Sequence, residues 1–298
     1  MPERRETQIV EDPISGDIAL QSRARGRRPN EFRQWDNVDC PFCPGAESQT
    51  PQEIASIVDG SGAWLARAFL NKYPAVTPPD GDHELIVDSA AHDDELTRAG
   101  VGLWRERLRA ALGRYSNAMP VLFKNSGEFA GATIRHPHTQ LITLARPIPR
   151  WERLRARALA HWERSAGCVW CEDARQAPSE GRSVETLGLI AAYVPSRSRY
   201  PSLLRFIPLR CAASFSEASD AELDDFTALA RRAVRGLDGL AFNLFFEGDP
   251  NGPPGASHWH ADLVPRESTF AGFELASGLH ITTGAPEESA GLWRRMMA

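Results

Sequence analysis

Residues 131–141 are Gly131-Ala-Thr-Ile-Arg-His136-Pro-His138-Thr-Gln140-Leu141, and this segment decides how the rest of the chain is interpreted. We expect a strand here, and residues two apart on an extended strand face the same side. His136 and His138 are therefore expected side by side, so that a zinc ligand can hold the backbone next to a reactive imidazole. A neutral imidazole, with a pKa of about 6.5, is nucleophilic at pH 7 without a helper base.

The same pattern recurs downstream as His258-Trp-His260-Ala-Asp262, and four of the five cysteines form two Cys-x-x-Cys pairs, Cys40–Cys43 and Cys168–Cys171. An odd cysteine count does not suit a closed disulfide framework, so the pairs are redox or metal motifs. Prolines and a glycine flank the first pair, which is typical of a knuckle that presents thiolates to zinc. A redox pair belongs between a strand and the start of a helix, so the metal interpretation is favoured.

The two sets of metal-type residues follow one order at similar spacings. His92 lies 49 residues after Cys43, Cys211 lies 40 residues after Cys171, and the His-x-His segments begin 44 and 47 residues later. Structural zinc takes four Cys or His ligands. The first set offers Cys40, Cys43, His92 and one histidine of the His-Pro-His, and the second offers Cys168, Cys171, Cys211 and His258. Two zinc ions per chain are therefore expected.

Matching secondary-structure signals lie between these residues. Strand patterns at 83–88 and 203–208 precede His92 and Cys211. Each is followed by a helix pattern, one opening at Asp93 and the other at a Ser219–Glu222 capping box, and then by strands at 120–124 and 241–246. We therefore expect an α+β protein with two copies of one module, 1–150 and 151–298, each an antiparallel sheet with helices packed on it. An amphipathic helix at 151–165 is expected in the connection.

Composition excludes several classes of protein. The chain has 298 residues, of which 42% are hydrophobic and 24% charged, so it is long enough for two domains with real cores. The net charge of -5 and the pI of about 5.9 argue against a partner such as nucleic acid or an anionic membrane. The sequence shows no run of about 18 apolar residues and no signal-peptide pattern behind Met1. We expect a cytoplasmic protein.

The segment His-Pro-His-Thr-Gln closely resembles the galactose-1-phosphate uridylyltransferases, a branch of the histidine triad superfamily. Further segments carry the resemblance: the upstream Cys-x-x-Cys, Asn71-Lys-Tyr-Pro-Ala-Val and His83-Glu-Leu-Ile-Val-Asp-Ser. His258-Trp-His-Ala-Asp-Leu-Val-Pro-Arg266 and Ala271-Gly-Phe-Glu274 are similar to the sub-branch that includes the plant ADP-glucose:phosphate adenylyltransferase. The resemblance runs from about residue 9 to about residue 295, and it implies that both modules are histidine-triad-like.

This resemblance implies roles for individual residues. It makes His136 a zinc ligand, His138 the nucleophile that carries the nucleotide, and Gln140 an uncharged donor to a phosphoryl oxygen. Histidine triad hydrolases have a histidine in place of Gln140, and a Gln cannot handle protons, which favours transfer to an acceptor phosphate over hydrolysis. The expected substrate-binding residues are Arg25, Arg28, Asn71, Tyr73, Asn125, Gly127, Gly131, Thr133, Phe273 and Glu274. Of these, the arginines, Asn125, Thr133 and the glycines are expected at phosphate, Asn71 and Tyr73 at the base, and Phe273 and Glu274 at the hexose.

The second module departs from the pattern. Asp262 stands in place of Gln140 and Trp259 in place of Pro137. Cys211 stands where the similar sub-branch has a histidine. The second module is therefore expected to keep a metal scaffold without phosphoryl chemistry. For His260, a structural and a substrate-facing role both stay open.

The leading hypothesis is a nucleotidyltransferase of carbohydrate and galactose metabolism that works by double displacement, uridylyl transfer between hexose 1-phosphates being the main version. Phosphorolysis of an ADP-sugar or another nucleotide sugar by inorganic phosphate is the alternative. A zinc-stapled module that binds nucleotides or nucleic acid is the alternative from another class, and the acidic pI argues against it. A zinc hydrolase would need an open metal position, and the counted ligands close both sites. A homodimer is one assembly that the sequence allows.

Overall fold

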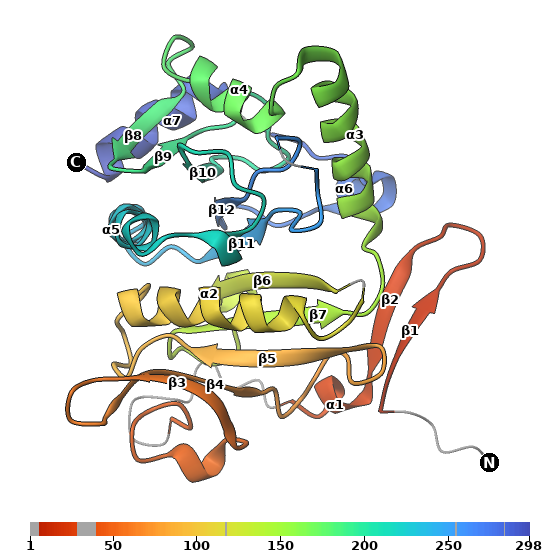
Figure 1. Ribbon diagram of the computed structural model, residues 1–298, viewed down its shortest axis with the longest axis vertical. Helices are drawn as coiled ribbons and strands as arrows, with labels where there is room; N and C mark the ends of the chain where they lie inside the picture. Colours follow the sequence, from red (N-terminus) through yellow and green to blue (C-terminus); the bar gives the residue numbers. More distant parts are fainter. Residues whose placement is uncertain (1–5, 29–39, 117, 254, 283) are drawn as a thin grey trace. The chain divides into compact units, whose positions relative to one another are not determined.

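The structure is a computed structural model that describes residues 6–28, 40–116, 118–253, 255–282 and 284–298. The chain divides into two compact units, and each contains an antiparallel sheet with helices (Figure 1). Unit 1 comprises Met1–Leu122 and Thr133–Ile148, and unit 2 comprises Phe123–Ala132 and Pro149–Ala298. The prediction of an α+β fold is confirmed.

In unit 1 the sheet has the order β3-β4-β5-β7, followed by the first half of β6. Its strands are β3 (Glu53–Val58), β4 (Trp64–Leu70), β5 (Gly81–Val87), β6 (Met119–Ser126) and β7 (His138–Leu144). Helix α2 (Arg98–Leu112) packs on β3, β4, β5 and β7 and buries Trp104 completely. The remaining elements are the hairpin β1 (Thr7–Glu11) and β2 (Ile18–Ser22), the short α1 (Arg23–Gly26) and the 3-10 turn η1 (Glu47–Gln49).

Helix α2 begins later than the sequence pattern predicts. Its N-cap is Thr97, whose hydroxyl accepts a hydrogen bond from the Gly100 amide, whereas the expected start was Asp93. Leu96 has a φ of 58°, which is incompatible with a helical turn at this position. The acidic residues before Leu96 therefore belong to the loop that carries His92, not to the helix.

In unit 2 the sheet has the order β11-β12-β10-β9-β8, and the second half of β6 pairs with β11. Its strands are β8 (Ser183–Leu187), β9 (Ile190–Tyr193), β10 (Leu204–Pro208), β11 (Phe242–Glu247) and β12 (His260–Pro265). The helices and turns are η2 (Glu128–Ala130), α3 (Pro149–Ser165), α4 (Val169–Gln176), η3 (Phe215–Glu217), α5 (Asp220–Gly236), α6 (Gly272–Ser277) and α7 (Pro286–Met296).

Helix α5 covers the sheet of unit 2 and begins at the predicted capping box. Ser219 accepts from the Glu222 amide while the Glu222 carboxylate accepts from the Ser219 amide. The core under α5 is aromatic, with Phe206, Phe215, Phe226, Phe246 and Trp259 in mutual ring contact. Burial of each such side chain contributes about 1.5–3 kcal/mol. Among the helices of the described residues, none combines the length and the apolar character of a membrane span.

Candidate active site and metal clusters

Four side chains of unit 1 place their metal-binding atoms within 4.8 Å of one another: Cys40, Cys43, His92 and His136. The Nδ1 atom of His136 lies 3.7 Å from the Cys40 sulfur and 3.5 Å from the Cys43 sulfur, and His92 Nδ1 lies 3.4 Å from Cys43. His136 Nε2 is 2.8 Å from the Ser89 carbonyl, which can only accept, so Nε2 carries the ring proton. The His136 lone pair on Nδ1 therefore faces the thiols.

The second cluster repeats this arrangement in unit 2, with Cys168, Cys171, Cys211 and His258. His258 Nδ1 lies 3.2 Å from the Cys171 sulfur, and His258 Nε2 donates to the Pro208 carbonyl at 3.1 Å. The Cys-x-x-Cys pair here stands at a helix start, because Cys168 is the N-cap of α4. Helix context alone is also compatible with a redox pair, and the convergence of Cys211 and His258 on the same point favours metal.

The donor sets of both clusters fit zinc. Each holds four sulfur or imidazole donors, the ligands that structural zinc prefers. Burial of the Cys40 thiol raises its pKa to about 11, so a thiolate at this buried position needs a nearby cation. A bound dication supplies that charge and deprotonates its thiol ligands.

His138 lies directly beyond the first cluster, as the first residue of β7, and is 5% exposed. Its Nδ1 lies 2.9 Å from the His136 carbonyl, which again can only accept. The proton of the neutral ring is therefore on Nδ1, and the nucleophilic lone pair is on Nε2. His136 precedes β7 instead of lying within it, so the two histidines are linked by this hydrogen bond and not by a shared strand face.

Next to His138 is a cavity of about 280 Å³, close to the lower end of the roughly 300–1,000 Å³ range for small-molecule sites. Six residues predicted from the sequence to bind substrate or act in catalysis line it: Arg28, Asn71, Tyr73, Thr133, His138 and Gln140. Apolar side chains that the sequence analysis missed form another part of the wall, among them Phe42, Phe69, Leu85 and Ile134. The Phe42 ring centroid lies 5.5 Å from that of His138, so an apolar slot adjoins the nucleophile.

His83, on β5, is a further polar residue at this site that the sequence analysis did not single out. It is 2% exposed, and its Nε2 lies 3.0 Å from Oε1 of Gln140 and 3.2 Å from Nδ2 of Asn71. Burial lowers the pKa of His83 to about 3, and the charge of Arg25 adds to this effect. His83 is thus neutral at pH 7. Only the register of β5 against β7, which pairs Leu85 with Gln140, brings the two side chains together.

Arg25 and Arg28 form a basic pair near His83. Burial lowers the pKa of both guanidinium groups, and the charge of Arg28 lowers the pKa of Arg25 further. Two partly buried like charges favour an anion beside them. The electrostatics of this pair therefore suit a phosphate group.

The other predicted substrate residues lie in unit 2. Gly127 and Gly131 have φ angles of 87° and 85°, and a Cβ on Gly127 would lie 2.7 Å from the Ala241 side chain, so the loop requires glycine at 127. Asn125 accepts a hydrogen bond from Asn243 at 2.9 Å. On α6, Phe273 is 53% exposed, and the Glu274 carboxylate accepts from the Ala271 amide at the start of that helix.

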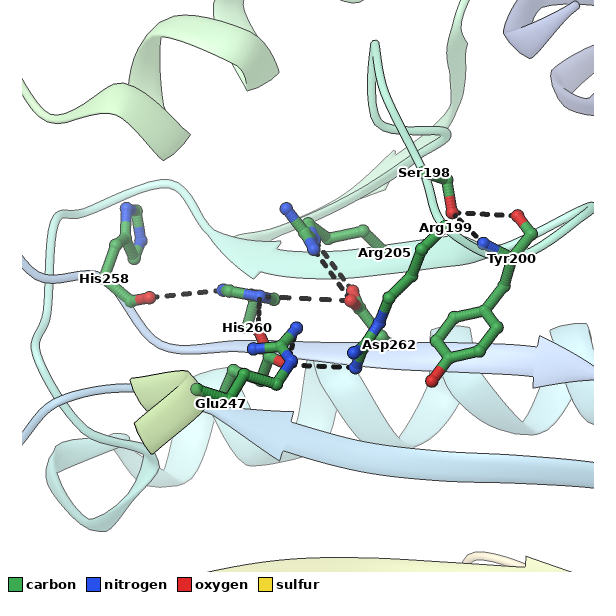
Figure 2. Close-up of polar contacts among 9 residues, drawn as sticks. Ser198, Arg199, Tyr200, Arg205, Glu247, His258, His260 and Asp262 are labelled. Carbon is green, nitrogen blue, oxygen red and sulfur yellow. Dashed lines mark hydrogen bonds and ion pairs between the residues drawn. The ribbon is translucent and has the colours of Figure 1, made fainter. Parts of the chain in front are cut away.

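A third group of donor atoms lies in unit 2, where Glu247, His260 and Asp262 approach one another within 4.8 Å (Figure 2). His260 Nδ1 donates to the His258 carbonyl at 3.3 Å. Its Nε2 faces an oxygen of Glu247 at 3.4 Å and one of Asp262 at 4.0 Å. The group was not anticipated as a unit, because its members come from two strands of the sheet.

Arginines already compensate both carboxylates of this group. Arg205 makes two hydrogen bonds of 2.7 Å to Asp262, while Arg150 and Arg199 lie 2.7 and 3.9 Å from Glu247. Figure 2 shows Arg199 and Arg205 converging on the two carboxylates. Three guanidinium charges outnumber two carboxylates, so an added dication is repelled. We therefore interpret this group as an ion-pair network.

Comparisons with known proteins agree with the motifs. The family described as domain of unknown function (DUF4931), N-terminal domain, matches residues 22–146. The chain is 23% identical to ADP-glucose phosphorylase of Arabidopsis thaliana, over 99% of this chain and 94% of that protein. It is also 23% identical to galactose-1-phosphate uridylyltransferase of Streptomyces lividans, over 85% of this chain and 70% of that protein. The resemblance to the galactose-1-phosphate uridylyltransferases is confirmed.

The fold is shared as well. The crystal structure of an ADP-glucose phosphorylase from Arabidopsis thaliana with bound ADP-glucose superposes with a TM-score of 0.79 at 23% identity, covering 97% of this chain and 98% of that one. The ADP-glucose phosphorylase branch therefore fits the chain in both sequence and fold.

Proposed function

We propose that the chain transfers a nucleotidyl group from a nucleotide sugar to a phosphate acceptor by double displacement through His138. The observation that carries this proposal is the state of His138: its Nδ1 proton is bound to the His136 carbonyl, and its ring borders a cavity that Gln140 also lines. A neutral imidazole whose lone pair is on Nε2 is a competent nucleophile toward phosphorus.

In the first half-reaction, His138 Nε2 forms a bond to the α-phosphorus, and the bond from that phosphorus to the sugar 1-phosphate oxygen breaks. The sugar 1-phosphate leaves with the electron pair. In the second half-reaction, an oxygen of the acceptor phosphate attacks the same phosphorus and the P–N bond breaks, so that His138 returns to its neutral state. Gln140 donates to a non-bridging oxygen in both steps, and Arg25 and Arg28 balance the phosphate charge.

The surroundings of Gln140 favour transfer over hydrolysis. Its neighbour His83 has its pKa lowered to about 3 by burial, and His83 Nδ1 is engaged by the Ala75 amide at 3.0 Å. A base with such a low pKa does not take a proton from water at pH 7. The nucleotidyl group on His138 is therefore held next to an amide and a neutral imidazole.

We further propose one zinc ion in each Cys/His cluster, two per chain. Cys40, Cys43, His92 and His136 would hold the first, and Cys168, Cys171, Cys211 and His258 would hold the second. When bound, zinc supplies folding free energy and fixes the backbone around its ligands. The division into a catalytic module, 1–150, and a second module, 151–298, stays a prediction.

The acceptor distinguishes two versions of this function. The main version, uridylyl transfer to a hexose 1-phosphate, matches the relative from Streptomyces lividans. Phosphorolysis by inorganic phosphate is the alternative, and it matches the ADP-glucose phosphorylase of Arabidopsis thaliana, which aligns over 99% of this chain and 94% of that protein.

Intact-mass spectrometry tests both versions. The protein is incubated briefly with UDP-, ADP- or GDP-glucose, and the nucleotide that adds to the chain identifies the donor. The loaded protein is then chased with glucose 1-phosphate, galactose 1-phosphate or inorganic phosphate, and the compound that unloads it is the acceptor. A chain that stays unmodified by all three donors would refute the covalent route.

A further inference from the structure

Hydrogen bonds that start at a backbone group fix the orientation of Gln140. The Ala75 amide lies 3.0 Å from His83 Nδ1, and a backbone N–H can only donate. Nδ1 therefore carries no proton, and the neutral His83 ring carries its proton on Nε2. That proton reaches Gln140 Oε1 at 3.0 Å.

The nearby Asn71 does not compete for this proton. Asn71 Oδ1 accepts from the Tyr73 amide at 2.9 Å, so its Nδ2, 3.2 Å from His83 Nε2, is itself a donor. The bond from His83 to Gln140 thus engages the oxygen of the Gln140 amide. The NH₂ group of Gln140 is what remains to face a ligand in the cavity.

We propose that His83 is a positioning residue for nucleotidyl transfer, which binds the oxygen of the Gln140 carboxamide so that the NH₂ group of Gln140 is held toward a phosphoryl oxygen. This inference rests on the proposed function. An amide is nearly symmetric in shape, and turning it by 180° would present a carbonyl oxygen to an anion. The backbone-anchored series disfavours the turned state, because turning would place the Gln140 NH₂ group 3.0 Å from the protonated Nε2 of His83 and leave that proton without its acceptor.

The low pKa of His83 agrees with this role. A histidine that is neutral over the whole working range keeps one tautomer and one direction of donation.

The first test reads the tautomer without any enzyme turnover. Two-bond ¹H–¹⁵N NMR spectra of the zinc-loaded protein, with His83 assigned by comparison with His83→Gln, report which ring nitrogen carries the proton. We expect His83 to be the Nε2–H form from pH 8 to pH 5.5. An Nδ1–H form, or titration of His83 within that range, would overturn the proposal that His83 positions Gln140, whether or not the protein is active. If the tautomer is as expected but no nucleotide sugar loads His138, the proposed function fails and the tautomer assignment stands.

A double-mutant cycle then tests whether His83 acts through the carboxamide of Gln140. We expect His83→Leu to lower kcat by about 10- to 100-fold, less than the roughly 100- to 1000-fold typical for loss of a whole donor. In a Gln140→Ala background, the same change should have almost no further effect. His83→Gln, whose amide can accept from Ala75 and donate to Gln140, should recover most of the rate. An equal loss in both backgrounds would show a merely structural role and overturn the proposal.

Discussion

After each Cys/His cluster, the second histidine of the His-x-His makes the same hydrogen bond, but the surroundings of that histidine differ between the two units. In both units the first histidine of the His-x-His faces cysteines, and the second donates its Nδ1 proton to the carbonyl two residues earlier, at 2.9 Å for His138 and 3.3 Å for His260. The Nε2 atom of His138 belongs to a ring that borders a cavity, whereas that of His260 faces two carboxylates. In the proposed function, the residues around the histidine, and not the shared Nδ1 hydrogen bond, separate the nucleophile His138 from His260.

The substitution of Asp262 for Gln140 is central to this difference. A carboxylate attracts Arg205, and the resulting ion pair fills the space beside His260 with fixed charges. An amide in the equivalent place leaves His138 beside a neutral donor. Phosphoryl transfer needs donors that are already aimed at the anion, and arginines bound to carboxylates are not available for it.

The largest expected effect comes from removing the nucleophile. His138→Ala should abolish formation of the nucleotidyl-enzyme, because no P–N bond can form, while zinc content and melting temperature stay at the parent values. The matched control is His260→Ala, the corresponding residue of the other unit, which should still load nucleotide. Intact-mass spectrometry after incubation with the donor provides the measurement. Loading of the His138 variant, or loss of loading in the His260 variant alone, would reverse the roles assigned to the two units.

Gln140 should give the next largest effect. Gln140→Ala is expected to slow both half-reactions by about 100- to 1000-fold, the usual loss for one well-placed donor. Gln140→His should instead shorten the lifetime of the loaded intermediate in the absence of acceptor, because a titratable ring beside it can relay a proton to water. Release of free nucleotide is timed after excess donor is removed. An intermediate that lives as long in the His variant as in the parent would mean that Gln140 does not determine the preference for transfer.

The sequence identified the residues that converge at the candidate sites better than the residues that support them. The eight Cys and His residues of the two clusters were recognisable because their types and spacings are typical of metal ligands. His83 was not recognisable, since its side chain meets Gln140 only through the register of β5 and β7. Asn243 lies among aromatic residues on β11 and donates to residues more than 100 positions away. Such partners are set by tertiary structure and leave no local signal.

Helix starts illustrate the same limit. The Ser219 capping box was predicted and is present, because both of its hydrogen bonds join residues three apart. Asp93 was expected to open α2, yet Thr97 does so, since its hydroxyl also donates to the Asp88 carbonyl on the far side of the loop. A local pattern is reliable where all of its partners are local.

Substitution of a proposed zinc ligand should affect stability more than nucleotide transfer, and the effects should differ between the two units. Cys211→Ser and Cys168→Ser should lower zinc from two ions to one and reduce the melting temperature by roughly 10 °C, since 1 kcal/mol corresponds to about 2–4 °C in a domain of this size and a lost ligand costs several kcal/mol. Cys40→Ser should also lower the zinc content, and in addition slow nucleotide loading, because the first cluster holds His136. Metal analysis and calorimetry are the measurements. Parent-like melting of the Cys211 variant would show that the second cluster is not structural.

The smallest expected effect is a difference between the two units in the pH range over which each loses stability. Burial lowers the pKa of His83 to about 3, against about 6.5 in an unfolded chain. Burial acts to raise the pKa of Glu247, but the hydrogen bond and charge of His260, with Arg150 and Arg205, lower it to about 2, against about 4.5. In both cases the unfolded state binds the proton more readily, so the contribution to stability is present above the unfolded pKa and is lost as pH falls toward the folded pKa.

The windows therefore differ: stability through His83 is lost from about pH 6.5 downward, at up to about 1.4 kcal/mol per pH unit, whereas the contribution of Glu247 is retained until about pH 4.5. The measurement is the free energy of unfolding from pH 8 to pH 4 for the parent, His83→Gln and Glu247→Gln. Between pH 6.5 and pH 5 the free energy of unfolding of the parent should fall relative to that of His83→Gln and stay parallel to that of Glu247→Gln. Zinc release affects all three proteins alike, so it cancels in these comparisons. Parallel plots of the free energy of unfolding against pH for all three proteins in that interval would mean that His83 is not held neutral by burial. The contrast between a neutral site in unit 1 and a charged network in unit 2 would then lose its electrostatic basis.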